Sequence, residues 1–343
     1  MKVTFNILTL PKLYPLAISR GTMASSDNLF VSVEDGGVVG LGEHAPATGK
    51  AWTAERALGQ LSAFCASGFS LEPEETWEAM LAAEVDPPAM AALDIALWDL
   101  RANKAGKPLY ELLGLEKKSV PTSVTIGINP PAVTLERVPD ILRRTGAKCL
   151  KIKLGSPEGR AHDKEHFLAA KEASAPFGSI LRVDANGGWT VEEAIEMISW
   201  LKSHGVDYVE QPLVEGGEDG LLELFRNREL PLFIDESCRW ASDVAKWADR
   251  VDGVNLKLMK CGGVTEALRI VAEAKRHNLK TMIGCMSESS VAIAAGAAMG
   301  ALFDHIDLDS HLNLNPDPAS GAPIVNGVIV PLDVPGHGAS LND

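Results

Sequence analysis

Three carboxylates each end a short apolar run of this chain: Asp184 follows Leu-Arg-Val, Glu210 follows Tyr-Val, and Asp235 follows Leu-Phe-Ile. They recur at intervals of 26 and 25 residues. A lysine-bearing run lies on either side of the series, Lys151-Ile-Lys153 before it and Val-Asn-Leu-Lys257 after it. A solvated surface has no reason to keep such a period. We therefore expect three acids and two basic groups to meet at one site.

Three carboxylates in a semi-enclosed site raise one another's pKa and lose hydration, so they need a positive partner. A divalent cation meets that need, and an all-oxygen set without histidine or cysteine suits Mg²⁺, with Mn²⁺ as the alternative. Any single strand-end acid could instead cap the next helix, but three at this period with flanking lysines favour the metal. Neighbouring polar residues that could orient these ligands are Asn186, Gln211 and Glu236.

The lysines indicate the reaction type. Alternation along a strand places Lys151 and Lys153 on the same side. A nearby metal cation favours a neutral amine, and a lowered pKa is what a general base needs near neutral pH. Lys257 comes from the predicted sixth strand, roughly across from the second. Two amines facing each other could remove a proton from one face of a carbon and return one to the other, with Lys260 as a supporting charge.

The elements that must position these residues alternate regularly after Pro121. Short β-branched apolar runs predict strands at 121–127, 148–154, 180–184, 206–210, 232–235, 253–257, 281–285 and 304–307. The intervening segments predict helices at about 132–145, 159–175, 190–203, 218–228, 241–248, 263–276 and 287–300. Eight strands and seven helices predict an α/β fold, a parallel (β/α)7β barrel without its last helix. A doubly wound open sheet is the alternative, but no Gly-x-Gly-x-x-Gly follows any strand.

The first part of the chain has a different texture. Strands are expected at 2–9, 29–34 and 38–43, the last two joined by the turn signal Asp35-Gly36-Gly37. An Ala- and Leu-rich helix should open at a proline and cover 88–103. These patterns predict an α+β domain over 1–118, a barrel over 119–321, and a C-terminal segment, 322–343, that returns to the first domain with a strand pair at 322–332.

Composition excludes several protein classes. The chain has 343 residues, is 46% hydrophobic, and can bury a large core. A formal charge of −14 argues against nucleic-acid binding, and no apolar stretch is long enough to span a membrane. The five cysteines are scattered without a Cys-x-x-Cys pair, and no signal-peptide pattern opens the chain, so we expect a cytoplasmic protein. The oligomeric state stays open, with a homo-oligomer as one option.

The ordered motifs resemble a known family. Lys151-x-Lys153, Asp184-Ala-Asn186, Glu210-Gln-Pro212, Asp235-Glu-Ser237 and Lys257-Leu-Met-Lys-Cys-Gly-Gly263 are similar to those of the enolase superfamily, muconate-lactonizing-enzyme subgroup. The resemblance implies a capping domain over the barrel and Mg²⁺ held by the three carboxylates. It also implies removal of the proton α to a carboxylate to give an enediolate, with Lys153 and Lys257 as acid/base residues and Lys151 neutralising the substrate carboxylate.

The eighth strand separates the reactions of that subgroup. It ends His305-Ile-Asp307-Leu-Asp309, two carboxylates on one face, which would attract a cation. This Asp-x-Asp is similar to that of dipeptide epimerases, where the pair binds the substrate's α-ammonium group, and Gly284-Cys-Met-Ser-Glu288 also resembles their pattern. The resemblance thus implies an isomerase that transfers a proton at the C-terminal residue of a dipeptide. Thr125 and Ser287 are expected to add hydrogen bonds to this small-molecule substrate.

Substrate side-chain specificity is expected in two capping-domain loops, about 15–26 and 43–52. Arg20 falls near where L-Ala-D/L-Glu epimerases present an arginine to the glutamate side chain, although an Arg-Gly turn can equally be structural; Lys50 is a second candidate contact. The family connects such enzymes with peptidoglycan-peptide recycling. The proline-rich loop 312–321 departs from the family pattern, which leaves the preferred N-terminal residue open.

Other functions remain compatible with parts of the pattern. A cycloisomerase, an o-succinylbenzoate synthase or an N-acylamino-acid racemase would share every metal and lysine residue. Their substrates carry no ammonium group, so Asp307 and Asp309 discriminate against them. A non-catalytic metal-dependent binding protein is the alternative from another class, and two opposed lysines argue against it.

Overall fold

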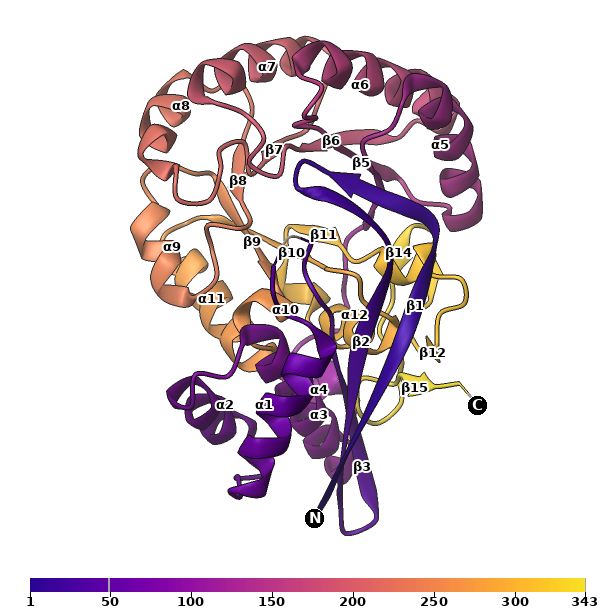
Figure 1. Ribbon diagram of the computed structural model, residues 1–343, viewed down its shortest axis with the longest axis vertical. Helices are drawn as coiled ribbons and strands as arrows, with labels where there is room; N and C mark the ends of the chain where they lie inside the picture. Colours follow the sequence, from indigo (N-terminus) through magenta and orange to yellow (C-terminus); the bar gives the residue numbers. More distant parts are fainter. Residues whose placement is uncertain (49, 343) are drawn as a thin grey trace.

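The computed structural model describes residues 1–48 and 50–342. Gly49 and Asp343, which fall in the predicted segments 43–52 and 322–343, lie outside the described residues. A three-stranded antiparallel sheet and a group of helices form the first region (Figure 1). Its elements are β1 (Lys2–Ile18), β2 (Gly21–Asp35), β3 (Val38–His44), α1 (Ala54–Ala66), α2 (Pro73–Ala82), α3 (Pro87–Ala105) and α4 (Leu109–Leu112).

Helix α3 is the core of this region. It begins with a proline, as predicted, and ends at Gly106, whose φ of 65° is the left-handed conformation that glycine adopts easily. Its Ala-rich face lies directly on β3, where a Cβ added at Gly42 would come within 2.0 Å of the Ala92 carbonyl oxygen. The predicted turn between β2 and β3 is confirmed, with Asp35 paired to Val38.

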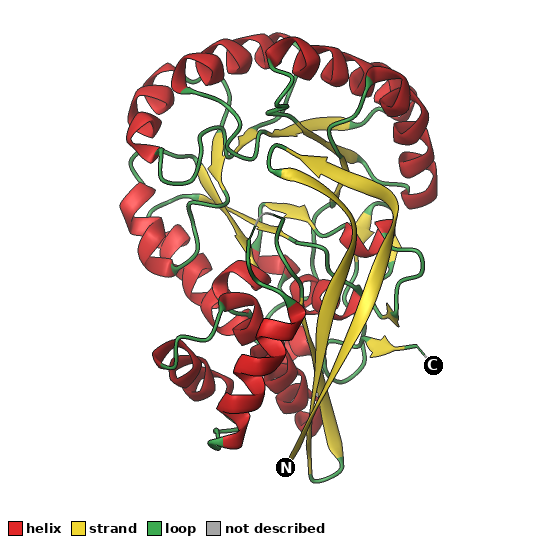
Figure 2. Ribbon diagram, in the orientation of Figure 1, coloured by secondary structure: helices red, strands yellow, loops and turns green. Residues whose placement is uncertain are grey.

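The remaining chain forms the predicted parallel barrel. Eight strands follow one another in the order β4 to β11, and an isolated parallel bridge between Thr122 and Ile306 joins the last to the first. Figure 2 shows the helices as an outer arc around these strands. The elements are β4 (Ser123–Ile126), α5 (Pro131–Thr145), β5 (Cys149–Lys153), α6 (Arg160–Ser174), β6 (Ile180–Asp184), α7 (Val191–Ser203), β7 (Val209–Glu210), α8 (Leu221–Asn227), β8 (Leu232–Ile234), α9 (Ala241–Trp247), β9 (Gly253–Lys257), α10 (Leu258–Cys261), α11 (Val264–Arg276), β10 (Lys280–Gly284), α12 (Ser290–Ala298) and β11 (His305–Asp307).

Two buried carboxylates attach the first region to the barrel. Asp94 on α3 accepts hydrogen bonds from the backbone N–H and hydroxyl of Thr265, at the start of α11. Glu43 on β3 accepts four, from Asn28, from the N–H and hydroxyl of Ser289, and from the Ala292 N–H. Asp94 faces the N-terminus of α11, and Glu43 faces that of α12. The free backbone N–H groups at a helix N-terminus favour negative charge. The capping region is therefore fixed over the carboxyl ends of the barrel strands.

The stretch 15–26 differs from its prediction as a loop. It is the tip of a long hairpin: β1 runs to Ile18 and β2 starts at Gly21. Figure 1 shows this hairpin crossing the barrel opening. The pairing of β1 with β2 is interrupted between Pro11 and Leu16, which breaks the alternation of buried and exposed residues. Pro11 and Pro15 also make this part of the sequence atypical of a strand.

The C-terminal segment corrects a second expectation. The predicted strand pair at 322–332 exists as β13 (Ile324–Val325) and β14 (Val328–Ile329), but it lies at the barrel base, where Gly327 O accepts from Thr122 N. The contact with the capping region is made further on. His337 bonds Asp99 and the Leu41 carbonyl, and Gly336 pairs with the chain around Leu109. The last short strands, β12 (Ala319–Ser320) and β15 (Ser340–Leu341), pair with each other.

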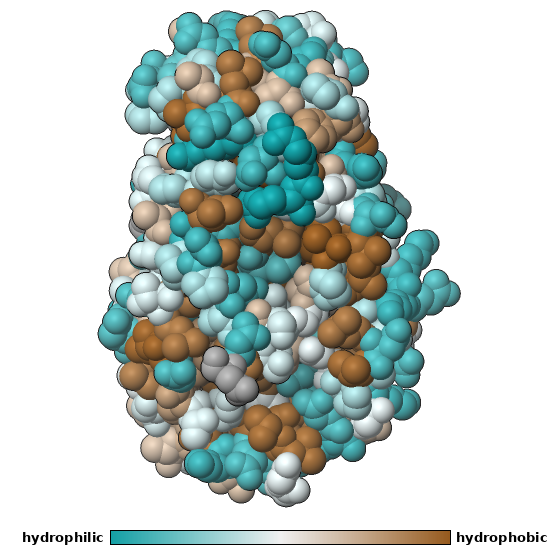
Figure 3. Space-filling model, turned by 90° about the vertical axis from the view of Figure 1, so that its right-hand side faces the viewer, coloured by the Kyte–Doolittle hydropathy of each residue, from teal (hydrophilic) through white to brown (hydrophobic). Residues whose placement is uncertain are grey.

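The surface carries its apolar side chains in small groups. Figure 3 shows brown patches separated by hydrophilic residues on the face at the right of Figure 1. Among the described residues, large apolar side chains such as Leu13 and Val334 are exposed singly. No helix within the described ranges is both long enough and apolar enough to cross a membrane.

Candidate active site

The strand register brings the predicted residues to one end of the barrel. Lys153 on β5 pairs with Asp184 on β6, and Asp184 pairs with Glu210 on β7. On the other side, Gly284 on β10 pairs with Lys257 on β9 and with Asp307 on β11. The carboxyl ends of the strands in a parallel barrel form one mouth, so these side chains converge there.

The three carboxylates form a compact, buried group. Asp184, Glu210 and Asp235 each offer an oxygen, and these oxygens all lie within 4.8 Å of one another. None of the three side chains is exposed. Oε2 of Glu210 accepts no hydrogen bond from any described residue, and burial together with Asp184 raises the pKa of Glu210 to about 8. A donor set of three oxygens with an unsatisfied buried atom fits a hard divalent cation.

Polar neighbours hold these carboxylates in place. Gln211 has a left-handed backbone, with φ of 36°, and its side-chain oxygen accepts from Asp235 N at 2.8 Å. Asn186 donates its backbone N–H to Asp184 at 2.8 Å. Asn255, which we did not single out from the sequence, donates to Glu210 Oε1 at 2.7 Å. Its place two residues before Lys257 on β9 is the alternation signal that could have found it.

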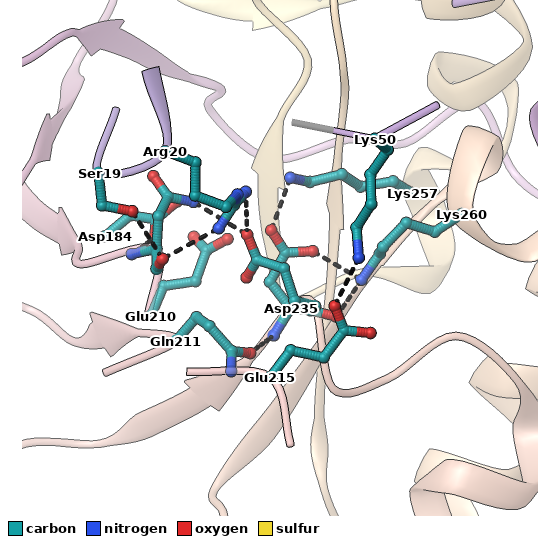
Figure 4. Close-up of polar contacts among 12 residues, drawn as sticks. Ser19, Arg20, Lys50, Asp184, Glu210, Gln211, Glu215, Asp235, Lys257 and Lys260 are labelled. Atoms are coloured by element: carbon teal, nitrogen blue, oxygen red, sulfur yellow. Dashed lines mark hydrogen bonds and ion pairs between the residues drawn. The ribbon is translucent and has the colours of Figure 1, made fainter. Parts of the chain in front are cut away.

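The two candidate acid/base lysines approach from opposite walls. Lys153 Nζ lies 2.5 Å from Asp184 Oδ2. Lys257 Nζ lies 2.6 Å from Asp235 Oδ2 (Figure 4). Both ammonium groups line the same cavity, although their strands are the second and the sixth of the eight. Lys260, which lies on α10, also contacts Asp235 and donates to the carbonyl oxygens of Cys238 and Asn255.

The charges around Lys257 differ from the sequence-based expectation. Although burial favours its neutral amine, Asp235 and Glu236 together raise the pKa of Lys257 above its usual range. The expectation of a lowered pKa counted a metal cation beside the lysine, whereas the ion pair with Asp235 sets the balance in this structure. The same contacts hold the pKa of Asp235 below its usual range against the effect of burial, so this carboxylate is ionised.

Lys151 connects the three buried carboxylates to Asp307, at the end of β11, and Asp309, two residues beyond it. Its ammonium contacts Asp307 and lies 3.6 Å from Glu210 Oε2. Asp307 Oδ1 is buried without a hydrogen-bond partner among the described residues. Asp309 Oδ2 accepts the backbone N–H of Thr125 at 2.7 Å, and Thr125 lines a second cavity together with both aspartates. This cavity adjoins the first, because Lys153, Leu16, Cys285 and Met286 line both.

Arg20 and Lys50 reach the first cavity but already have partners (Figure 4). Arg20 donates to Glu236 Oε1 at 2.6 Å and to the Asn186 carbonyl at 2.9 Å, and Lys50 pairs with Glu215 at 2.8 Å. Ser19 beside Arg20 also donates to the Asn186 carbonyl, so the hairpin tip is bonded to a residue next to the three buried carboxylates. The predicted residue Ser287 lines this cavity too, with its hydroxyl 3.0 Å from the Met23 sulfur.

Glu288 gives the site a measurable pH dependence. Burial, with a contribution from Glu43, raises the pKa of Glu288 from 4.5 to about 8. A raised carboxyl pKa means that the fold prefers the neutral acid, so its stabilising contribution is complete at low pH and is lost as pH rises from about 4.5 to about 8. Asp184 and Asp235 have lowered pKa values and act only at lower pH. Glu210, whose pKa is also about 8, acts in the same direction as Glu288. We therefore expect the thermal midpoint in EDTA to fall between about pH 5 and pH 8.5.

The Glu288→Gln variant isolates this contribution, because glutamine keeps the shape and the acceptor for the Met286 N–H. Its midpoint should fall less steeply across the same pH range, as measured by differential scanning calorimetry. The exposed Glu165→Gln on α6 serves as the control. Equal slopes for Glu288→Gln and the wild type would contradict the assignment.

Comparisons with known proteins agree with this geometry. Residues 2–114 match the family described as mandelate racemase / muconate lactonizing enzyme, N-terminal domain, and residues 134–343 match the enolase C-terminal domain-like family. A hydrophobic dipeptide epimerase from Roseobacter litoralis is 58% identical, with 100% of this chain and 99% of that protein covered. Another protein of that name, from a Flavobacteria bacterium, is 55% identical with the same coverage.

Solved structures show the same likeness. The crystal structure of the dipeptide epimerase from Enterococcus faecalis V583, complexed with Mg and the dipeptide L-Leu-L-Tyr, has a TM-score of 0.91 and 32% sequence identity. The match covers 99% of each chain. Two family matches that together span nearly the whole chain, and the site described above, lead to one conclusion. The chain belongs to the enolase superfamily, in its mandelate racemase / muconate lactonizing enzyme branch.

Proposed function

We propose that this protein is a Mg²⁺-dependent dipeptide epimerase that inverts the α-carbon of the C-terminal residue. The observation that carries the proposal is the placement of Lys153 and Lys257, which face one cavity from opposite walls beside three buried carboxylates. The names of the 58% and 55% identical relatives support the same substrate class.

Each part of the site has a task in this reaction. Asp184, Glu210 and Asp235 would hold the metal, which when bound supplies positive charge to the substrate carboxylate and makes the adjacent α-proton more acidic. One of Lys153 and Lys257, as the neutral amine, takes the α-proton from its side of the carbon. The other, as the ammonium, delivers a proton from the opposite side. Lys151 lies between Glu210 and Asp307 and adds positive charge near the substrate carboxylate.

The second cavity suits the substrate's ammonium group. Asp307 presents a buried oxygen without a partner, and Asp309 lies beside it on the same cavity wall. An ammonium bound there completes the hydrogen bonding of Asp307 and balances the charge of the pair. An N-acylated amino acid or a cycloisomerase substrate offers no such cation. This feature therefore favours dipeptides over the substrates of the other enzymes in the branch.

The first cavity favours an apolar side chain on the epimerised residue. Its charged side chains are paired within the protein, Arg20 with Glu236, and Lys50 and Arg239 with Glu215. A glutamate side chain, which the sequence raised as an option, would have to break the Arg20 pair. The other lining residues are mainly apolar: Leu16, Ile18, Pro46, Ala47, Trp52 and Met286. We infer that the preferred second residue is a hydrophobic amino acid such as leucine.

The ammonium subsite can be tested by changing one charge. We expect Asp309→Asn to lower kcat/KM for L-Ala-L-Leu by about 10- to 100-fold, because a charge-assisted hydrogen bond to the ammonium is lost. Activity on N-acetyl-L-leucine, which has no ammonium, should stay at its wild-type level. Steady-state epimerisation measured by chiral chromatography gives both values.

Asp249→Asn, an exposed change outside the barrel mouth, is the matched control and should leave both substrates unaffected. Equal losses on the two substrates in Asp309→Asn would assign Asp309 to the fold or to the chemistry. That result would remove the reason for preferring a dipeptide.

A further inference from the structure

Lys12 is a charged residue of the site to which the mechanism above gives no task. It lies where β1 leaves its register with β2, between Pro11 and Leu16. In that interval the strand pairs instead with the loop after β11: Lys12 forms an antiparallel bridge with Leu314, and Asn315 N donates to the Pro11 carbonyl at 2.9 Å. Asn313 adds two side-chain bonds to the backbone of Tyr14. This pairing holds Lys12 over the second cavity.

The Lys12 side chain lines that cavity together with Asp307, Asp309 and Thr125. It forms no hydrogen bond or ion pair with any residue in 1–48 or 50–342, whereas Lys151, Lys153, Lys257 and Lys260 at the same mouth are all paired. Burial lowers the pKa of Lys12, although the charges of Cys285 and Asp309 act in the opposite direction. A partly buried cation that faces a cavity without a hydrogen bond or an ion pair favours an anionic group there.

The location of the cavity limits which anionic group of a substrate can reach Lys12. The C-terminal carboxylate of a dipeptide belongs at the three metal-binding carboxylates, and its ammonium belongs at Asp307 and Asp309. A positive charge at Lys12 disfavours an ammonium in the same cavity unless a negative group accompanies it. The peptide carbonyl is neutral and cannot supply that charge. The remaining part of the substrate in this cavity is the side chain of the N-terminal residue.

We propose that Lys12 selects dipeptides whose first residue is acidic, with the aspartate or glutamate carboxylate bound by the Lys12 ammonium. This inference rests on the proposed function and extends it: the substrate class becomes an acidic residue followed by a hydrophobic one. Lys12 contacts no reacting atom and acts through binding alone. Its effect should therefore appear in KM, with kcat nearly unchanged.

The test compares L-Glu-L-Leu with L-Gln-L-Leu, which differ only in the charge of the first side chain. We expect wild-type kcat/KM to favour L-Glu-L-Leu by at least about tenfold, the usual effect of a hydrogen bond between charged groups. Lys12→Met should bring the ratio close to one by raising KM for L-Glu-L-Leu. Lys12→Arg should keep most of the preference, and Lys202→Met, an exposed change on α7, should keep all of it.

The outcomes separate this inference from the proposed function. A wild-type ratio near one, or a ratio that Lys12→Met does not change, overturns the role of Lys12 while epimerisation of both dipeptides upholds the proposed function. Absence of turnover with both dipeptides and with L-Ala-L-Leu overturns the two together. Thermal midpoints of the Lys12 variants show whether they fold, and the arginine variant supplies the result if Lys12→Met is unstable.

Discussion

Epimerisation should fall by roughly 10²- to 10⁴-fold when either Lys153 or Lys257 is replaced by methionine, the usual contribution of a positioned acid or base. Each lysine faces the substrate from its own wall of the cavity, so neither can take over the task of the other. Inversion should therefore show the full loss, whereas proton exchange should persist for one of the two epimers. In D₂O, Lys257→Met should exchange the α-hydrogen of only one epimer, and Lys153→Met that of only the other. Proton NMR of the two separate epimers measures this directly.

Lys280→Met is the control for the loss of a lysine charge, because Lys280 lies at the start of β10, away from the barrel mouth. That variant should invert both epimers at the wild-type rate. Exchange of both epimers by either cavity variant would contradict the assignment of one lysine to each face. In Lys153→Met, Lys151 remains near Asp184, and in Lys257→Met, Lys260 remains paired with Asp235. Neither variant therefore leaves a buried carboxylate without a cation.

Loss of metal binding should be the second large effect. Glu210→Gln removes the central charge of the three carboxylates, and we expect kcat to fall by at least about a thousandfold, since a bound metal supplies several kcal/mol of charge stabilisation. Mg²⁺ affinity measured by isothermal titration calorimetry should fall in parallel. Addition of EDTA to the wild type should abolish activity, and added Mg²⁺ should restore it.

The same variant should have an opposite effect on stability. Glu210 is buried with a pKa of about 8, so removing its charge should leave the metal-free protein at least as stable at neutral pH. The glutamine oxygen can still accept from Asn255. A Glu210→Gln protein that keeps Mg²⁺ affinity and activity would contradict the ligand assignment. Loss of activity together with a much lower thermal midpoint would instead indicate a structural role for Glu210.

The barrel was predictable because its elements are locally regular. Each parallel strand is a short apolar run that ends near a glycine or a polar residue, and helices such as α5 and α11 have a clear amphipathic period. The β1–β2 hairpin was not, because its pairing from Leu10 onward depends on partners across the hairpin and on the loop around Leu314. The return of Gly336 and His337 to the capping region likewise depends on distant partners on α3 and β3.

The residues at strand ends followed from the sequence because the barrel itself brings them together. Asp184, Glu210, Asp235 and the lysines needed only the β/α period. The pairing of side chains could not be predicted from the sequence. No sequence pattern indicates that Arg20 pairs with Glu236 or that Lys12 has no partner. Such contacts depend on how the hairpin lies over the mouth. The specificity of the site is therefore the part that required the structure.

The central claim is that two opposed lysines invert the C-terminal α-carbon of a dipeptide. Proton NMR of L-Ala-L-Leu and L-Glu-L-Leu incubated with enzyme and Mg²⁺ in D₂O tests it most directly. The α-hydrogen signal of leucine should disappear while signals of the D-leucine epimer grow, and the α-hydrogen of the first residue should persist. Retention of the leucine α-hydrogen across a panel of dipeptides, or exchange at the first residue, would contradict the account.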